Sequence, residues 1–338
     1  MRFGRRMLGA ALLLVPLLAP ASAHARERAA PPVVVFDTDM DYDDAATLAY
    51  LAQEHRLGRI ELRAVTVVNN GGGRPGRAIR HARCLVERLG LRGVQVADGS
   101  NTAPNAFPVE ILETVDKVLT TVTRGCTAAE TPSRVPAPEL IRRVLRQEPG
   151  AQIIATGPLS NVAAALPEAA GRVTSMGGAV GVPGNLWRTP PEFDGSQEFN
   201  YWIDPPASRA FIRHSPRPPR MVPLNATDDV PVTQEYVDRL RADARTPAAE
   251  IVVEAFTHPD VQPLIAADLL FWWDPLAAVS VVHPEIVEFT SGRVDVVTDG
   301  PAAGRTFLSA TGRRVGYAIG ADRAGFEERF LATLNGRR

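Results

Sequence analysis

Apolar and polar positions follow two alternating patterns along the first third of the chain. Short runs of β-branched residues indicate buried strands, and longer stretches with apolar residues three and four positions apart indicate helices. These patterns predict strands at 33–37, 60–68 and 94–97, separated by helices at 43–54 and 76–90. Strands that alternate with helices are typical of a parallel sheet whose two faces are covered.

The alternation continues to the C-terminus, with one irregular region. Segment 98–136 is rich in Pro, Asn and Thr around a helix predicted at 109–121, so we expect a loop-rich flap there. Further strands are predicted at 152–155, 173–176, 221–224, 286–290, 293–298 and 305–309, and further helices at 138–146, 205–211, 232–242, 248–257, 269–281 and 323–334. We therefore expect one α/β domain over residues 26–338, with a mostly parallel, Rossmann-like open sheet flanked by helices.

Residues 1–25 have the pattern of a secretory signal peptide. Three arginines precede an apolar core at 7–18, and small residues follow at 21–25, with cleavage expected after Ala23 or Ala25. A membrane anchor is the alternative, but the apolar run is short and contains Pro16. The pattern favours export, and thus a secreted or periplasmic protein without a stable membrane anchor.

Charge and cysteine content limit the kinds of partner. The chain has 37 Lys and Arg against 38 Asp and Glu, a formal net charge of −1, and no basic run, so nucleic acid is not expected as a partner. A small molecule fits better, and the sequence leaves open whether the protein forms a homo-oligomer. Cys84 and Cys126 either form a disulfide, which an exported protein permits, or remain buried free thiols.

Five carboxylates lie at the end of the first predicted strand and directly after it: Asp37, Asp39, Asp41, Asp43 and Asp44. Ligands of open α/β sheets bind beyond the carboxyl ends of strands, and the repulsion between these charges is relieved most simply by Ca²⁺ or Mg²⁺. The plainest alternative is an acidic cap and first turn of a helix.

Two other acidic motifs fit less well. An EF-hand loop needs Gly where Tyr42 stands and Glu where Leu48 stands. A haloacid-dehalogenase-like phosphotransferase needs a supporting lysine, and Lys117, the only lysine, has no recognisable active-site context.

Other polar residues are expected at the same edge of the sheet. Asn69 and Asn70 follow the second strand, and Thr156 follows the strand at 152–155. Asp274 lies in an apolar stretch and needs a partner. It is either a metal ligand or the cap of a helix that starts at Pro275.

In these residues the chain resembles the inosine-uridine-preferring nucleoside hydrolases, which cleave the N-glycosidic bond of ribonucleosides with a bound Ca²⁺. The family's opening Asp-x-Asp-x-x-x-Asp-Asp is matched by Asp37, Asp39, Asp43 and Asp44. The resemblance continues in order at 67–70, 155–161, 176–178, 184–185, 198–200 and 273–275.

The resemblance implies a role for each matched residue. Ca²⁺ would be held by the side chains of Asp39, Asp44 and Asp274 and by the backbone carbonyl of Thr156. The ribose hydroxyls would be held by Asp43, Asn70, Asn185, Glu198 and Asn200. Asp39 would also accept the proton of the attacking water.

Three departures from the family pattern concern the base. The segment 185–198 is longer than usual and contains Trp187, the flap at 98–136 lacks the usual Gly-rich pattern, and Trp273 stands where many members have a histidine. Purine-specific members are similar at this last position. We therefore expect Trp273 to stack on a purine, with Trp187 as a second ring, unless Trp273 is only a core residue.

Two rival functions remain at this point. One is a non-catalytic nucleoside or sugar receptor on the same scaffold. The other is a hydrolase of another ribosyl compound. The full set of proposed metal ligands favours an enzyme, because a receptor needs no activated water.

Overall fold

In the computed structural model, nine strands of the described residues form one sheet in the order β3-β2-β1-β4-β5-β6-β9-β7-β8. The structure describes Met1 and residues 30–166, 172–186 and 193–337. The strands are β1 (Val33–Thr38), β2 (Glu61–Val67), β3 (Gln95–Asp98), β4 (Gln152–Ala155), β5 (Arg172–Met176), β6 (Arg220–Val222), β7 (Val287–Val296), β8 (Thr306–Leu308) and β9 (Arg313–Ala321). The expected single α/β domain is confirmed, since the sheet is mostly parallel and residues 31–338 form one compact unit.

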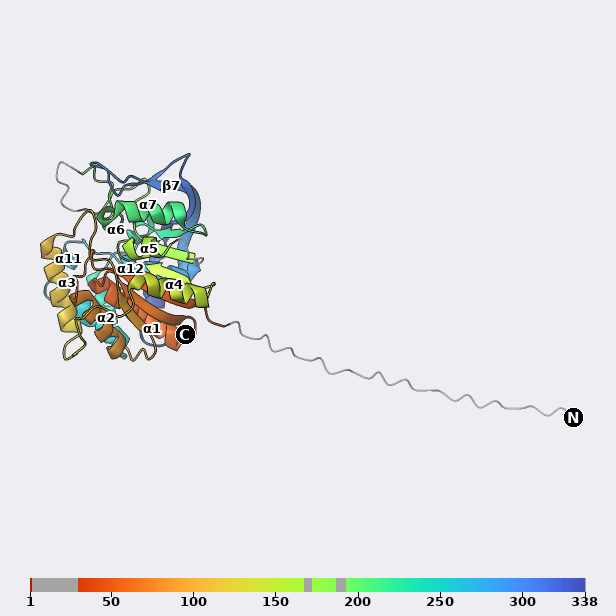
Figure 1. The fold of residues 1–338 in the computed structure, drawn as a ribbon. Coiled ribbons are helices and arrows are strands. Elements are labelled where there is room, and N and C mark those ends of the chain that lie inside the picture. The colour runs from red at the N-terminus through yellow and green to blue at the C-terminus, as the bar shows by residue number, and fades with distance from the viewer. Residues whose placement is uncertain (2–29, 167–171, 187–192, 338) are drawn as a thin grey trace. The chain divides into compact units, whose positions relative to one another are not determined.

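Both faces of the sheet are covered by helices. Val34 and Phe36 of β1 belong to one apolar core and Val35 to the other, as the alternation of side chains in a strand requires. The first core includes α1 (Tyr42–Arg56), α2 (Arg77–Arg88), α3 (Val109–Val122), α9 (Gln234–Asp243), α10 (Pro247–Phe256), α12 (Trp273–Val282) and α13 (Arg323–Leu334). The second includes α4 (Ala137–Gln147), α5 (Ser160–Ala165) and α7 (Pro205–His214), which Figure 1 shows stacked on one face.

The remaining short helices lie in connections. They are α6 (Phe199–Ile203), α8 (Leu224–Thr227), α11 (Gln262–Ala266) and the 3₁₀ turn η1 (Pro284–Ile286). No helix among the described residues has the length and apolar character needed to cross a bilayer. The predicted signal peptide and Trp187 lie outside the described residues, apart from Met1.

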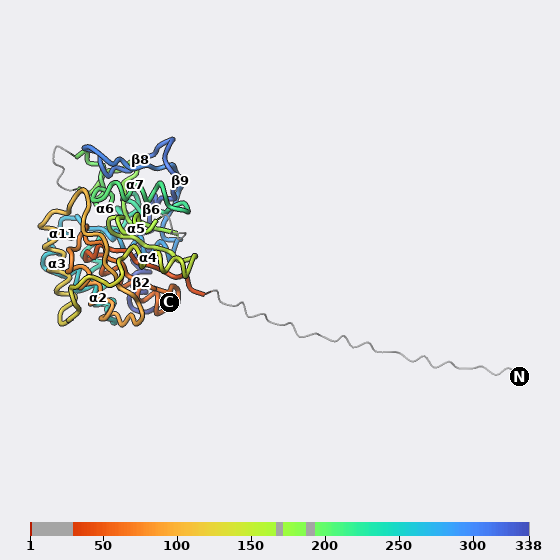
Figure 2. The backbone as a smooth tube through the Cα atoms, viewed as in Figure 1, coloured from red at the N-terminus to blue at the C-terminus, as the bar shows by residue number. Residues whose placement is uncertain are grey.

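Two predictions near the C-terminus are wrong. The strands expected at 286–290 and 293–298 are one continuous strand, β7, and β9 was not predicted at all. β9 pairs in parallel with β6, whose label stands near its own in Figure 2, and antiparallel with β7. Its two arginines and two glycines weaken the local strand pattern, so this strand is specified by its pairing with distant parts of the chain.

The helix predicted at 269–281 also begins later than expected. Residues 270–272 run extended beside 230–232, with Trp272 donating its backbone N–H to the Val230 carbonyl at 2.9 Å. The helix α12 starts at Trp273, so the alternative of a helix that starts at Pro275 with Asp274 as its cap is wrong.

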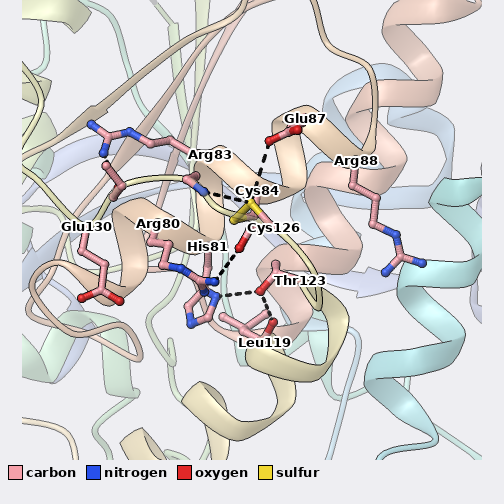
Figure 3. The surroundings of a disulfide bond; sticks show 12 residues. Arg80, His81, Arg83, Cys84, Glu87, Arg88, Leu119, Thr123, Cys126 and Glu130 are labelled. Carbon is pink, nitrogen blue, oxygen red and sulfur yellow. Dashed lines mark hydrogen bonds between the residues drawn. A yellow bond between two sulfur atoms is a disulfide. The ribbon is translucent and has the colours of Figure 1, made fainter.

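The flap at 98–136 contains the expected helix, α3, and is tied to α2 by a disulfide between Cys84 and Cys126 (Figure 3). The sequence did not decide between this disulfide and two free thiols, and the structure contains the disulfide. Polar contacts also join α2 to the flap. His81 on α2 bonds Thr123 at 3.2 Å and Asp116 of α3 at 3.0 Å. These contacts fix the position of α3, whose first turn reaches the cavity described below.

Removing the disulfide should destabilise the domain without changing its fold. The bond joins residues 42 positions apart, and closing a loop of that length stabilises a fold by about 2–4 kcal/mol. We expect Cys84→Ser with Cys126→Ser to lower the free energy of unfolding by about this amount, as measured by urea denaturation. An unchanged midpoint relative to the oxidised wild type would contradict the expected stabilisation by the disulfide.

Candidate active site

The candidate site lies where the strand order reverses. β1 has β2 on one side and β4 on the other, and the chain leaves β1 and β4 towards opposite faces of the sheet. This is the topological switch point at which open α/β sheets bind their ligands. Asp39 follows β1 and Thr156 follows β4, so two predicted site residues meet there.

The turn after β1 holds Asp39 in a tight space. Met40 has a φ of 61°, which is strained for a residue with a side chain, and its N–H donates to the Thr38 hydroxyl at 2.9 Å. The Gly72 N–H donates to Asp39 Oδ2 at 2.6 Å. A Cβ at Gly157 would lie 2.7 Å from the Asp39 Cβ, so only glycine lets the loop after β4 approach this carboxylate.

The start of α1 supplies the next carboxylates. Asp41 caps the helix by accepting from the Tyr42 N–H at 2.5 Å, and Asp44 Oδ2 accepts from the Asp41 N–H at 2.8 Å. The predicted acidic cap is therefore present. The cap does not account for every carboxylate in the first turn. Asp43 also lies there, and its side chain lines a cavity at this edge of the sheet.

Asp274 reaches the same place from the first turn of α12. The carboxylates of Asp43, Asp44 and Asp274 offer oxygen atoms that all lie within 4.8 Å of one another. Two helix N-termini thus present their acidic first turns to one point, where the positive end of each helix dipole favours negative charge.

Burial makes this cluster electrostatically unfavourable without a cation. Asp39, Asp43 and Asp274 are at most 7 % exposed. Burial raises the pKa of each carboxyl well above its usual value, and the neighbouring carboxylates raise it further. No Arg, Lys or His of the described chain forms an ion pair with them. Several oxygen ligands without a basic partner are the donor set of a hard divalent cation.

Thr156 links the cluster to the next segment of the wall. Its hydroxyl donates to Asp44 Oδ1 at 2.5 Å, and its carbonyl accepts from Asn200 Nδ2 at 2.8 Å. Asn200 lies in α6, whose N-terminus is capped by Glu198. The Glu198 carboxylate accepts three backbone N–H groups, from Gly178, Asn200 and Tyr201. Besides the ribose contact expected from the sequence, Glu198 therefore has a structural role, because these bonds fix the orientation of α6.

Of the two other predicted ribose ligands, one lines the cavity and one does not. Asn185 lines the cavity and accepts from the Phe199 N–H at 3.0 Å. Asn70 does not line it; its Nδ2 donates to the Thr102 carbonyl and to the Ser160 hydroxyl, and its buried Oδ1 has no partner among the described residues. Among the described residues, the structure brings together all the predicted site residues except Asn70, and Trp187 lies outside the described residues.

Part of the cavity lining is aromatic and apolar. Trp273 lines it, while the neighbouring Trp272 is fully buried in the core. The rings of Phe107 and Phe199 stack at 4.8 Å between centroids. Ile111 and Leu270 complete this part, and the described lining contains no histidine. Phe107 was missed because nothing in its Pro- and Asn-rich surroundings marks it, whereas Phe199 lies inside the matched 198–200 segment.

The comparison with known families decides the identity of this arrangement. The model of the inosine-uridine preferring nucleoside hydrolase family matches residues 34–328. The chain belongs to this family. It is thus a nucleoside hydrolase acting on a small-molecule ribonucleoside, and the receptor hypothesis is wrong.

Individual relatives extend the likeness over most of the chain. "Probable uridine nucleosidase 2" of Oryza sativa subsp. japonica is 27% identical over 286 residues, which cover 81% of each chain. The inosine-uridine preferring nucleoside hydrolase of Bacillus anthracis superposes with a TM-score of 0.78 and 24% identity, covering 90% of this hydrolase and 99% of that chain. A purine-preferring ribonucleoside hydrolase of Gardnerella vaginalis gives 0.72 and 21%, covering 90% and 98%. The fold of the hydrolase is therefore that of its family.

Proposed function

We propose that the chain is an exported, Ca²⁺-dependent hydrolase that cleaves purine ribonucleosides to the free base and ribose. The observation that carries this proposal is the group of four buried carboxylates, Asp39, Asp43, Asp44 and Asp274, beside an aromatic cavity. The carboxylates suit a cation and the ribose hydroxyls. The aromatic lining suits the flat base.

The residues around the carboxylates would orient the sugar. Asp43, Asn185, Glu198 and Asn200 all line the cavity and carry oxygen or amide groups that hydrogen-bond hydroxyls. Asn70 does not line the cavity, and its predicted role requires its Oδ1, which has no partner among the described residues, to turn towards the sugar. The side chains of Asp39, Asp44 and Asp274 and the carbonyl of Thr156 would hold the metal.

The chemistry is the addition of water across the N-glycosidic bond. When bound, Ca²⁺ supplies charge that lowers the pKa of coordinated water and positions vicinal hydroxyls. Asp39 accepts the proton of the attacking water, whose oxygen forms the new bond to C1′ through an oxocarbenium-like state. The bond from C1′ to the base breaks, its electron pair stays on the base, and a purine takes its proton at N7 from solvent.

Removing calcium tests this proposal most directly. We expect a chelator to abolish ribose release from a panel of ribonucleosides, and added Ca²⁺ to restore it. Because the cation binds only the folded state, Ca²⁺ at about 100 times its dissociation constant should also stabilise the fold by about 3 kcal/mol, measured by thermal unfolding. Full activity in the chelated protein would contradict the metal dependence.

Trp273 should decide between purine and pyrimidine substrates. Stacking on an indole favours electron-poor or partly protonated rings by roughly 0.5–2 kcal/mol, and a pyrimidine has no basic atom equivalent to N7. We expect inosine, adenosine or guanosine to be hydrolysed well and uridine poorly, and Trp273→Ala to lower kcat/KM for inosine by about 3- to 30-fold.

The matched control is Trp273→Phe, which keeps an aromatic face and should retain most purine activity. Ribose release from inosine and uridine is measured for each folded variant. A preference for uridine, or a Trp273→Ala variant with full purine activity, would defeat the stacking hypothesis.

A uridine-preferring hydrolase is the second candidate, because the curated relatives from Oryza sativa are named probable uridine nucleosidases. The aromatic lining without histidine favours the purine reading. The same inosine and uridine comparison separates the two.

Export is supported by the signal-like pattern of residues 1–25, and the Cys84–Cys126 disulfide suits an oxidising compartment. The N-terminal residue of the mature protein provides the test. We expect His24 or Arg26, and an intact Met1 on protein outside the cytoplasm would contradict the cleavage.

A further inference from the structure

A second cavity adjoins the candidate active site and shares part of its wall. Tyr42, Ile111 and Phe199 line both cavities. All three are aromatic or aliphatic, and none of the carboxylates of the first cavity lines the second. The second cavity therefore adjoins the site along these three side chains, and its own lining includes none of the carboxylates of the site.

The walls of the second cavity are mostly apolar. Leu186, Phe193 and Trp202 line it from the segment that includes α6, and Pro108 and Leu264 come from the flap and from α11. The rings of Phe193 and Trp202 meet edge to face at 5.3 Å. The cavity volume is about 270 Å³, whereas a water molecule takes about 30 Å³ of liquid, so an aromatic ring fits.

Two of the residues that line the second cavity are acidic. Glu110 and Asp260 are exposed and line the cavity, and Lys117 lies 3.8 Å from Asp260. Two negative charges and one nearby positive charge disfavour an anionic ligand. The mostly apolar walls thus suit an apolar group that carries no negative charge.

We propose that the second cavity is a subsite for an uncharged, apolar substituent on the leaving base. The inference rests on the proposed function, in which the ribose binds at the carboxylates and the base at the aromatic lining. A base there presents its far edge to Tyr42, Ile111 and Phe199, the residues common to both cavities. A benzyl group on the exocyclic nitrogen of a purine has the chemistry of this subsite.

The expected gain follows from the apolar surface that such a group buries. Transferring a phenyl ring from water into an apolar site raises affinity by about 10- to 100-fold. We therefore expect kcat/KM for N6-benzyladenosine to exceed that for adenosine by about this factor. The dissociation constant should fall correspondingly.

Thr114 offers a way to block the subsite alone. It lies on α3, lines the second cavity, and does not line the first. We expect Thr114→Trp to fill the subsite, to leave adenosine hydrolysis within about twofold of wild type, and to remove the 10- to 100-fold gain for the benzyl compound. Glu113→Trp places the same side chain at an exposed neighbouring position that lines neither cavity, and should keep the gain.

Kinetics and calorimetric binding of both nucleosides to wild type and both variants give distinguishable outcomes. If adenosine is hydrolysed but the benzyl group brings no gain, or Thr114→Trp keeps the gain, the subsite is overturned and the proposed function stands. If no nucleoside is hydrolysed, the proposed function fails, and the binding data decide the subsite in the same way. Thermal unfolding of each variant shows that the comparison is made between folded proteins.

Discussion

Replacing Asp39 by asparagine should abolish turnover while the protein stays folded. The substitution removes the negative charge of a proposed metal ligand and, with it, the group that accepts the proton of water. General-base catalysis alone contributes about 10²- to 10⁴-fold, so we expect ribose release to fall by about 10³-fold or more. Folding should persist, because asparagine keeps the shape of the side chain and can accept the Gly72 N–H bond.

Bound calcium, measured on the purified variant, separates the two roles of Asp39. We also expect Asp44→Ala to weaken metal binding, since its carboxylate lies within 4.8 Å of those of Asp43 and Asp274. Asp238→Asn makes the same chemical change on the exposed side of α9 and should leave activity unchanged. Near-normal activity in Asp39→Asn would rule out the proposed mechanism.

Loss of a ribose hydroxyl from the substrate should lower the rate at least as much. Asp43 and Asn200 line the cavity beside the carboxylate cluster and are proposed to bind the 2′ and 3′ hydroxyls, together with Asn70. A site built to hydrogen-bond a hydroxyl rejects the analogue without it by about 10⁴-fold or more in favourable cases, because buried polar groups are left without partners. We expect this ratio of kcat/KM between inosine and 2′-deoxyinosine, and a similar ratio for 3′-deoxyinosine.

The variant Asp43→Ala provides the internal control for this selectivity. With the proposed hydroxyl ligand removed, the ratio between inosine and its deoxy analogue should shrink, even though both rates fall. Comparable kcat/KM for inosine and 2′-deoxyinosine in the wild type would show that Asp43 and its neighbours serve another purpose.

Local sequence patterns predicted those strands and helices whose own residues determine which face is buried. The alternation of β-branched runs with helical periodicity predicted β1 to β6 and the covering helices, because each of these elements buries a face that its own residues define. β9 could not be predicted in this way. It is an arginine- and glycine-containing strand that exists through its pairing with β6 and β7.

The sequence by itself determined the fold class, the family and the carboxylates of the site, because the aspartates follow β1 and open α1 within a few residues of one another. Only the tertiary structure decided the rest. It brought Asp274 to within 4.8 Å of Asp43 and Asp44, and it placed Trp272 in the core but Trp273 at the cavity. It also brought Phe107 of the flap against Phe199. Each of these contacts joins positions far apart in the chain, and such proximity depends on how helices pack on the sheet, which no local pattern of residues records.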